Sequence, residues 1–428
     1  MAPIRTAASL ILLVAAGLAA GCGGGAHAVQ TVGADSCGPL FFHGKGKPAY
    51  LVVSDLPLRA PPGAREQVAG IEQALELRGF RAGRYTVGYQ SCDDSSATVG
   101  ARDTAVCTAN AKAYAADPSV LGVIGPYNSE CAALEIPILN RAPAGPLAIV
   151  GTATTNPQLT ARVPGGDPGT PGSYYPTGVR NFVRLAAPDQ FQAAAAAMFA
   201  QEHRLARVYV LDDGEPYGTG MAGWFRQAAE ARGVHVVATE PWDPRAKDYG
   251  GLVDQVVRAR PDGVFLSGFA FLHGTAVLKQ LRAKLPAKTV VLAPDGFGDP
   301  GEDVAEAGKA ADGLYYLWAM VPPSAAGPLG KRILQRTGRE LDRDQQYGAL
   351  YGAAAAELVL DAIAASDGSR RSVVSHLFTS STRPSILGRI GFDRNGDPKT
   401  GPVTVYRIRR KKTTTSEVLY PHAPAPRG

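Results

Sequence analysis

Two short segments carry hydroxyl and backbone N–H groups where predicted parallel strands end. They are Gly125-Pro126-Tyr127-Asn128-Ser129 and Gly151-Thr152-Ala153-Thr154-Thr155-Asn156-Pro157. Strand ends and helix N-termini present unpaired N–H donors with a partial positive charge, and Ser or Thr hydroxyls add adjustable donors. Such a pair of loops can hold a small carboxylate without a metal. Each loop alone has a plainer explanation, with Ser129 as a helix cap and Thr154, Thr155 and Asn156-Pro157 shaping a turn.

The segments that must position these loops alternate between strand and helix patterns. Apolar runs typical of buried parallel strands occupy residues 50–53, 85–90, 120–124 and 146–150, and the pattern restarts at 207–211, 234–239, 263–266 and 289–292. Stretches with helical periodicity separate most of these runs, and a Pro/Gly-rich loop divides the two series. The sequence therefore predicts an α/β fold of two Rossmann-like lobes with open parallel sheets.

Length and charge agree with two lobes. At 428 residues and 45% hydrophobic composition, the chain exceeds one ordinary core and can fill two. The formal net charge of +6 is too mild to indicate a nucleic-acid partner. We assign residues 48–182 plus 322–385 to lobe I and residues 183–321 plus 386–410 to lobe II. Residues 23–47, rich in Gly and Ala, are expected to form a flexible tether, and residues 411–428 a frayed tail.

The N-terminus has the pattern of an export signal. Arg5 precedes an apolar run over residues 7–20, which is too short for a membrane span, and then comes Leu18-Ala19-Ala20-Gly21-Cys22. This string resembles the lipobox of bacterial lipoproteins, which implies a signal peptide over residues 1–22 and a lipid on Cys22. An ordinary secretory signal cut near Ala20 is the alternative. In both cases the mature chain is exported.

Four further cysteines, Cys37, Cys92, Cys107 and Cys131, indicate two disulfides in an exported protein, with three connectivities allowed. None of their spacings suits zinc, and no two of the seven histidines stand at a ligand spacing, so we predict no metal site.

Patterns for catalysis are weak. The G-x-G-x-x-G match at residues 218–223 is separated from its strand by residues 213–217, so no dinucleotide cofactor is predicted. No G-x-S-x-G motif or His-containing triad stands out. The adjacent acids Asp93-Asp94 and Asp212-Asp213 are more typical of caps and solvated turns. We expect no cofactor and no enzymatic activity, with an enzyme acting between the lobes as a remote alternative.

Four motifs together resemble the type I periplasmic binding proteins, in the leucine/isoleucine/valine-binding branch that serves ABC importers. They are V-I-G-P-Y-N-S from Val123, T-A-T-T-N-P-Q-L-T from Thr152, D-D-G-E-P-Y-G-T-G from Asp212 and A-P-D-G-F from Ala293. The resemblance covers residues 49–407 and implies two lobes, joined by three crossovers, that close on a ligand.

The resemblance also implies a set of ligand-binding residues. Ser129 and Thr155 would take an amino acid α-carboxylate, and the Ala153 carbonyl and the Thr155 hydroxyl would accept from its ammonium, with Thr154 in the same loop. From lobe II, Tyr217 matches a family tyrosine and Asp295 an acid that pairs with the ammonium. Asp295 is one methylene shorter than the usual Glu, and Phe269 stands where branched-chain binders carry Tyr. These two departures leave the ligand open.

The same resemblance implies disulfides Cys92–Cys131 and Cys37–Cys107. It predicts a monomeric lipoprotein on the outer face of the cell membrane that presents an amino acid or a similar small molecule to an ABC permease. A ligand sensor of the same fold without a transport role is the first alternative.

Overall fold

The strands form two separate sheets. The structure is a computed structural model that describes residues 31–59, 63–98, 103–163, 166–297, 306–337, 340–379, 386–410 and 412–421. Its strands are β1 (Tyr50–Leu56), β2 (Arg81–Ala82), β3 (Tyr85–Asp93), β4 (Val120–Ile124), β5 (Ala148–Gly151), β6 (Phe182–Arg184), β7 (Arg207–Asp212), β8 (His235–Pro241), β9 (Gly263–Ser267), β10 (Val290–Ala293), β11 (Leu314–Trp318), β12 (Val403–Arg409) and β13 (Lys412–Leu419). Its α-helices are α1 (Ala64–Leu77), α2 (Thr104–Ala116), α3 (Ser129–Asn140), α4 (Asp189–Glu202), α5 (Pro216–Glu230), α6 (Gly250–Ala259), α7 (Thr275–Lys284), α9 (Pro328–Arg336), α10 (Arg343–Ala365) and α11 (Arg370–Thr379).

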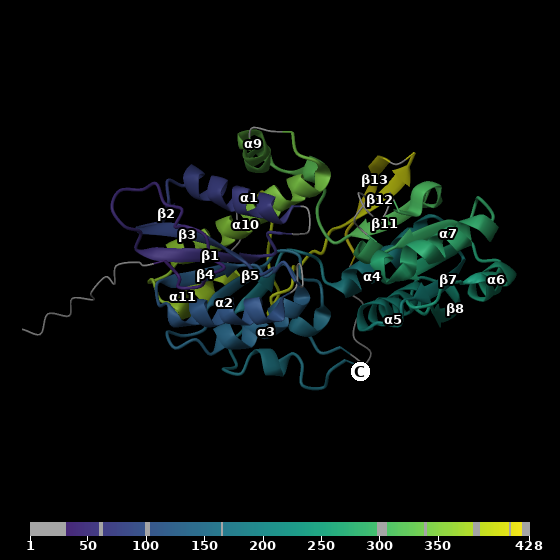
Figure 1. The fold of residues 1–428 in the computed structure, drawn as a ribbon, viewed down its shortest axis with the longest axis horizontal. Coiled ribbons are helices and arrows are strands. Elements are labelled where there is room, and N and C mark those ends of the chain that lie inside the picture. Colours follow the sequence, from purple (N-terminus) through teal and green to yellow (C-terminus); the bar gives the residue numbers. More distant parts are fainter. Residues whose placement is uncertain are drawn as a thin grey trace, which may run out of the picture.

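The two sheets share one strand order. Lobe I has the order β2-β3-β1-β4-β5-β6, and lobe II has β13-β12-β11-β10-β9-β7-β8. The five strands β3-β1-β4-β5-β6 and β8-β7-β9-β10-β11 pair in parallel in the same sequence of positions within each sheet. Figure 1 shows the lobes at opposite ends of the long axis. The predicted α/β fold of two Rossmann-like lobes is confirmed.

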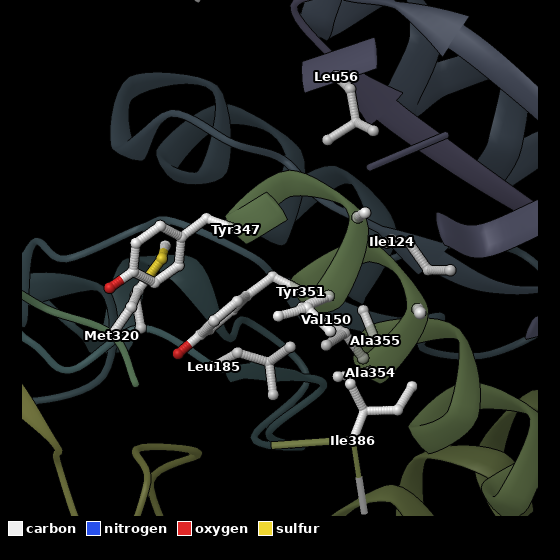
Figure 2. Packing of buried hydrophobic residues seen from close by; sticks show 14 of the residues in the cluster. Leu56, Ile124, Val150, Leu185, Met320, Tyr347, Tyr351, Ala354, Ala355 and Ile386 are labelled. Atoms are coloured by element: carbon white, nitrogen blue, oxygen red, sulfur yellow. The ribbon is translucent and has the colours of Figure 1, made fainter. Parts of the chain in front are cut away.

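Helix α10 forms the centre of the lobe I core. Asp342 caps it with a capping box to Gln345, and nearly all of its apolar residues are buried. It packs against α1 so closely that a Cβ on Gly70 would lie 2.0 Å from the Ala349 carbonyl oxygen. Figure 2 shows two rings, Tyr347 and Tyr351, reaching from α10 toward Met320 and Leu185. Within the described residues α10 is long and apolar enough to cross a membrane, but most of it is buried in the protein.

The chain passes between the lobes three times, after β6, after β11 and before β12. The first two passages are joined by a hydrogen bond from the Ala187 N–H to the Ala319 carbonyl, 2.9 Å. The third lies against the first: the Arg184 N–H donates to the Gly396 carbonyl, 3.1 Å. Gly396 has φ of 97°, and a Cβ there would lie 2.1 Å from the Phe182 carbonyl oxygen, so only glycine fits.

The expected tether and tail are wrong over much of their length. Residues 31–47 pack on lobe I, where Val32 is buried and Phe41 forms a backbone bridge with Tyr89 of β3. After Arg410, β13 pairs along the whole of β12, and the β-branched run Thr413-Thr414-Thr415 favours a strand there. Residues 1–30, with the predicted signal peptide and Cys22, lie outside the described residues.

The predicted disulfide pairs are also wrong. The structure links Cys37 to Cys92 and Cys107 to Cys131. Cys37 stands opposite Cys92 in an antiparallel bridge at the end of β3, while Cys107 and Cys131 lie in the first turns of the packed helices α2 and α3. Glu135 lies near the second pair, and these three are a possible metal-ligand group among the described residues, but the two sulfurs are bonded to each other.

Candidate functional site

A cavity of about 770 Å³ lies between the lobes. Its walls come from segments that follow β4 and β5 in lobe I and β7, β9 and β10 in lobe II. These are carboxyl ends of parallel strands, where open α/β sheets bind ligands. Six of the seven predicted ligand-binding residues line the cavity, namely Ser129, Ala153, Thr155, Tyr217, Phe269 and Asp295.

The two hydroxyl-bearing loops of lobe I meet at Ser129. This residue is the first of α3 and Asn128 is the N-cap, so Ser129 does not act as the cap. Its Oγ instead accepts a hydrogen bond from the backbone N–H of Asn156, 3.3 Å, in the second loop. The start of α3 thus faces the cavity beside Thr155, and its N–H groups suit a carboxylate.

Thr154 does not line the cavity. It is fully buried, and its hydroxyl points toward Gly151, where an added Cβ would lie 2.4 Å from Thr154 Oγ1. Its carbonyl accepts from Arg184 Nη1, 3.3 Å, and Arg184 also donates to the Asn156 carbonyl, 2.8 Å, and to Asp397, 2.7 Å. Thr154 therefore belongs to the support of the loop, which a buried arginine ties to the third crossover.

On the lobe II side, Asp295 is held by two hydrogen bonds. Its carboxylate accepts from the Tyr217 hydroxyl, 2.5 Å, and from Gln192 Nε2, 2.8 Å. The Tyr217 ring stacks on Phe269 with centroids 4.4 Å apart, which fixes the tyrosine. Burial raises the pKa of Asp295, while its hydrogen bonds with Tyr217 and Gln192 oppose this rise.

The sequence analysis missed Asp189, the first residue of α4. Asp189 lines the cavity, is buried, and its Oδ1 has no hydrogen-bond partner among the described residues. The Thr155 side chain hydrogen-bonds its carboxyl, and its N–H donates to the Thr155 carbonyl, 3.0 Å. Burial and then the charge of Asp295 raise the pKa of Asp189 well above the ordinary value. The only sequence pattern that marks Asp189 is an acidic residue in the first turn of a helix. Acidic residues are common there for purely structural reasons, so the pattern does not indicate a binding site.

The arrangement can bind a zwitterion. Hydroxyl and N–H donors on lobe I suit a carboxylate, and the carboxyl groups of Asp189 and Asp295, beside the Tyr217 hydroxyl, suit an ammonium. None of the described residues that line the cavity is a histidine, lysine or cysteine.

Fold and cavity together define a two-lobed α/β protein with its binding site between the lobes. A family model described as "Periplasmic binding protein" matches residues 60–414. The chain belongs to this family, whose members are substrate-binding proteins rather than enzymes, and the resemblance drawn from the motifs is confirmed.

Relatives and solved structures agree. The "Leucine-, isoleucine-, valine-, threonine-, and alanine-binding protein" of Pseudomonas aeruginosa is 24% identical over 273 residues, covering 63% of this chain and 67% of that protein. A Leu/Ile/Val-binding protein of Rhizobium johnstonii is 25% identical over 299 residues, covering 69% and 75%. The crystal structure of a leucine-binding protein from Thermotoga maritima has a TM-score of 0.68 at 22% identity and covers 86% of this chain and 98% of that one. A solute-binding protein of R. palustris in complex with benzoate has a TM-score of 0.63 at 15% identity, covering 87% and 96%.

Proposed function

We propose that the protein is an extracytoplasmic solute-binding lipoprotein that captures an amino acid between its lobes and presents it to the permease of an ABC importer. The observation that carries this proposal is the division of the cavity. The hydroxyl and N–H donors that suit a carboxylate are on lobe I, and the two acids that suit an ammonium, Asp189 and Asp295, are on lobe II. The relatives named for leucine, isoleucine and valine binding support an amino acid as the ligand.

In the proposed complex, the α-carboxylate accepts hydrogen bonds from Ser129 at the start of α3 and from Thr155 in the loop after β5. The ammonium donates to Asp295, to Asp189 and to the Ala153 carbonyl. Tyr217 holds Asp295 in place, and Phe269 covers the ligand from lobe II. Contacts from both lobes favour a closed state, because the ligand gains the second set only when the lobes approach.

Two substitutions test the site by calorimetric titration of the purified protein with the natural amino acids. Thr155→Val and Asp295→Ala are each expected to weaken binding by about 1–3 kcal/mol, since a buried partner loses its mate. Matched controls are Thr219→Val and Asp254→Ala, because Thr219 is exposed, Asp254 is half-exposed in an ion pair with Lys284, and both lie outside the cavity. Unchanged affinity in both site variants would contradict the assignment. No binding of any amino acid would contradict the proposed ligand class.

The anchor and the transport role need tests in cells. If Cys22 carries the lipid, Cys22→Ser moves the protein from the membrane fraction to the soluble fraction. Deleting the gene for this protein is expected to abolish high-affinity uptake of the amino acid that the protein binds. Normal uptake in the deletion strain, with ligand binding intact in the purified protein, would favour a sensor.

A further inference from the structure

The charged side chains along the cavity are all acidic. Glu130 and Asp189 reach it from the start of α3 and of α4, while Glu215 and Asp295 stand before α5 and after β10. None of the described residues that line the cavity is lysine, arginine or histidine. The guanidinium of Arg184, whose charge acts on Asp189, is buried and bound to Asp397 and to backbone carbonyls.

This charge pattern exceeds what a neutral amino acid needs. One carboxylate balances its ammonium, and N–H groups with hydroxyls suffice for its carboxylate. Asp189 still has an oxygen without a partner among the described residues, although it is only 7% exposed, and Asp295 contributes a second carboxyl beside it. Unpaired buried acids are costly, and an ammonium shared by this pair would offset that cost. The exposed acids Glu130 and Glu215 add further negative charge along the cavity, which a second cation on the ligand would balance.

An aromatic wall runs out from this acidic pair. Tyr217, which hydrogen-bonds Asp295, stacks on Phe269, and Phe269 stacks on Phe271 with ring centroids 4.9 Å apart and planes 29° apart. Phe271 is 60% exposed, an unusual state for a large apolar residue in this protein, and it lines the cavity. Stacked aromatic faces attract cations through the negative potential of their π-systems, and a guanidinium can also lie flat against them.

We infer that the ligand carries a net positive charge and is an amino acid with a basic side chain. Its α-ammonium binds at Asp295 and Asp189, and its side-chain cation lies against the ring face of Phe271 at the exposed end of the stack, toward the exposed acids Glu130 and Glu215. This inference rests on the proposed function and narrows it to a substrate class. It differs from the branched-chain ligands named for the relatives.

Isosteric pairs of ligands isolate the charge. L-arginine and L-citrulline have nearly the same shape, as do L-lysine and L-norleucine, but only one member of each pair is cationic. In titration calorimetry at low salt, we expect the cationic member to bind at least about 10-fold more tightly, with a ratio that shrinks as salt rises. Citrulline and norleucine binding as tightly as their cationic partners, or leucine binding more tightly than arginine and lysine, would overturn the inference and leave the proposed function standing.

Variants then locate the effect. Glu215→Gln and Phe271→Leu are each expected to reduce the arginine-to-citrulline ratio about 3-fold or more. Glu202→Gln is the matched control, because this exposed acid stands at the far end of α4, about 20 Å from Asp189. An equal loss in the control would assign the preference to overall charge and overturn the inference. Binding of no amino acid, with the protein folded by circular dichroism, would instead overturn the proposed function.

Discussion

Lobe I seals three carboxyls beside a disulfide, whereas the cavity between the lobes is lined by a close pair of carboxyls that a solute can reach. The sealed group is Asp55 at the end of β1, Asp94 just after β3 and Glu135 in α3, and all three side chains are fully buried. The cavity pair is Asp189 and Asp295. In both groups burial is the largest cause that raises the carboxyl pKa values. The negative charge of neighbouring acids raises the pKa further for Asp94, Glu135 and Asp189.

Access separates the two groups. Asn110 Nδ2 and the Tyr114 hydroxyl donate to Asp55 Oδ1, 2.7 and 2.8 Å, and the Asp55 and Glu135 carboxyls lie within hydrogen-bonding reach of each other. Contact between two carboxyls requires a proton on one of them. The sealed acids can therefore be neutralised by protons, while the cavity pair can also be neutralised by a ligand cation. The same residue type thus makes stability depend on pH in one place and suits the binding of a cation in the other.

The largest expected effect is on how the free energy of unfolding changes with pH. Burial and the charge of Asp55 raise the pKa of Asp94 to about 9, from an ordinary value of 3.8. Between these values the folded state holds a proton that the unfolded state has released, so stability is full below about pH 4 and falls as pH rises. The fall is about 1.4 kcal/mol per pH unit for each such carboxyl. Urea unfolding from pH 5 to pH 9 measures it.

Asp94→Asn mimics the protonated acid and is expected to flatten this slope and to stabilise the protein at pH 9. Asp254→Asn, at a half-exposed position on α6, serves as the control. Stability that is constant or rising from pH 5 to pH 9, or an unchanged slope in Asp94→Asn, would contradict the prediction.

Removing the Cys107–Cys131 disulfide should let water reach the three buried carboxyls of lobe I, as solvent reaches the carboxyls of the cavity. The double variant Cys107→Ala with Cys131→Ala opens a loop between residues 24 apart in sequence and is expected to cost about 3 kcal/mol of unfolding free energy. Water that reaches Glu135 and Asp94 should then lower their pKa values and weaken the pH slope. The comparison is the double variant Cys37→Ala with Cys92→Ala. An equal pH slope of stability in both double variants would argue that the Cys107–Cys131 disulfide does not seal the three carboxyls.

The smallest effect concerns the cavity pair. Asp189→Asn is expected to weaken amino acid binding by about 1–3 kcal/mol while leaving the stability of the ligand-free protein unchanged or higher, because a neutral amide is easier to bury. Asp94→Asn should show the opposite pattern, with altered stability and unchanged affinity. Titration calorimetry and urea unfolding on both variants decide this, and a loss of affinity in Asp94→Asn would break the contrast.

The pH dependence of binding sharpens the same contrast. The groups that face the pair are Thr155 and Arg184 at Asp189, and Tyr217 and Gln192 at Asp295. Since the pKa values of both acids are raised, a proton must leave before the ammonium pairs with two carboxylates. Affinity should therefore increase with pH from 5 to 8, and Asp189→Asn should remove most of that increase.

Local patterns in the chain were sufficient for the fold and for most of the cavity. Apolar runs and helical periodicity predicted both sheets, because strand burial and helix amphipathicity leave their mark on neighbouring residues. Ser129 and Thr155 were predicted because they follow strand ends, where parallel sheets place their loops together, whereas Tyr217 and Asp295 were predicted from the family resemblance.

Contacts between distant segments were decided only by the tertiary structure. The cysteine types allowed three pairings, and only the packing of α2 on α3 brought Cys107 to Cys131. Asp94 has the sequence pattern of a solvated turn, but elements from elsewhere in lobe I bury it. Asp189 gains its role from lying near Asp295, which is 106 residues later in the sequence of the same lobe. Sequence thus determined which residues form strands, helices and binding loops, since these depend on near neighbours. Burial and charge pairing depend on what the fold places opposite each side chain, and no local pattern carries that information.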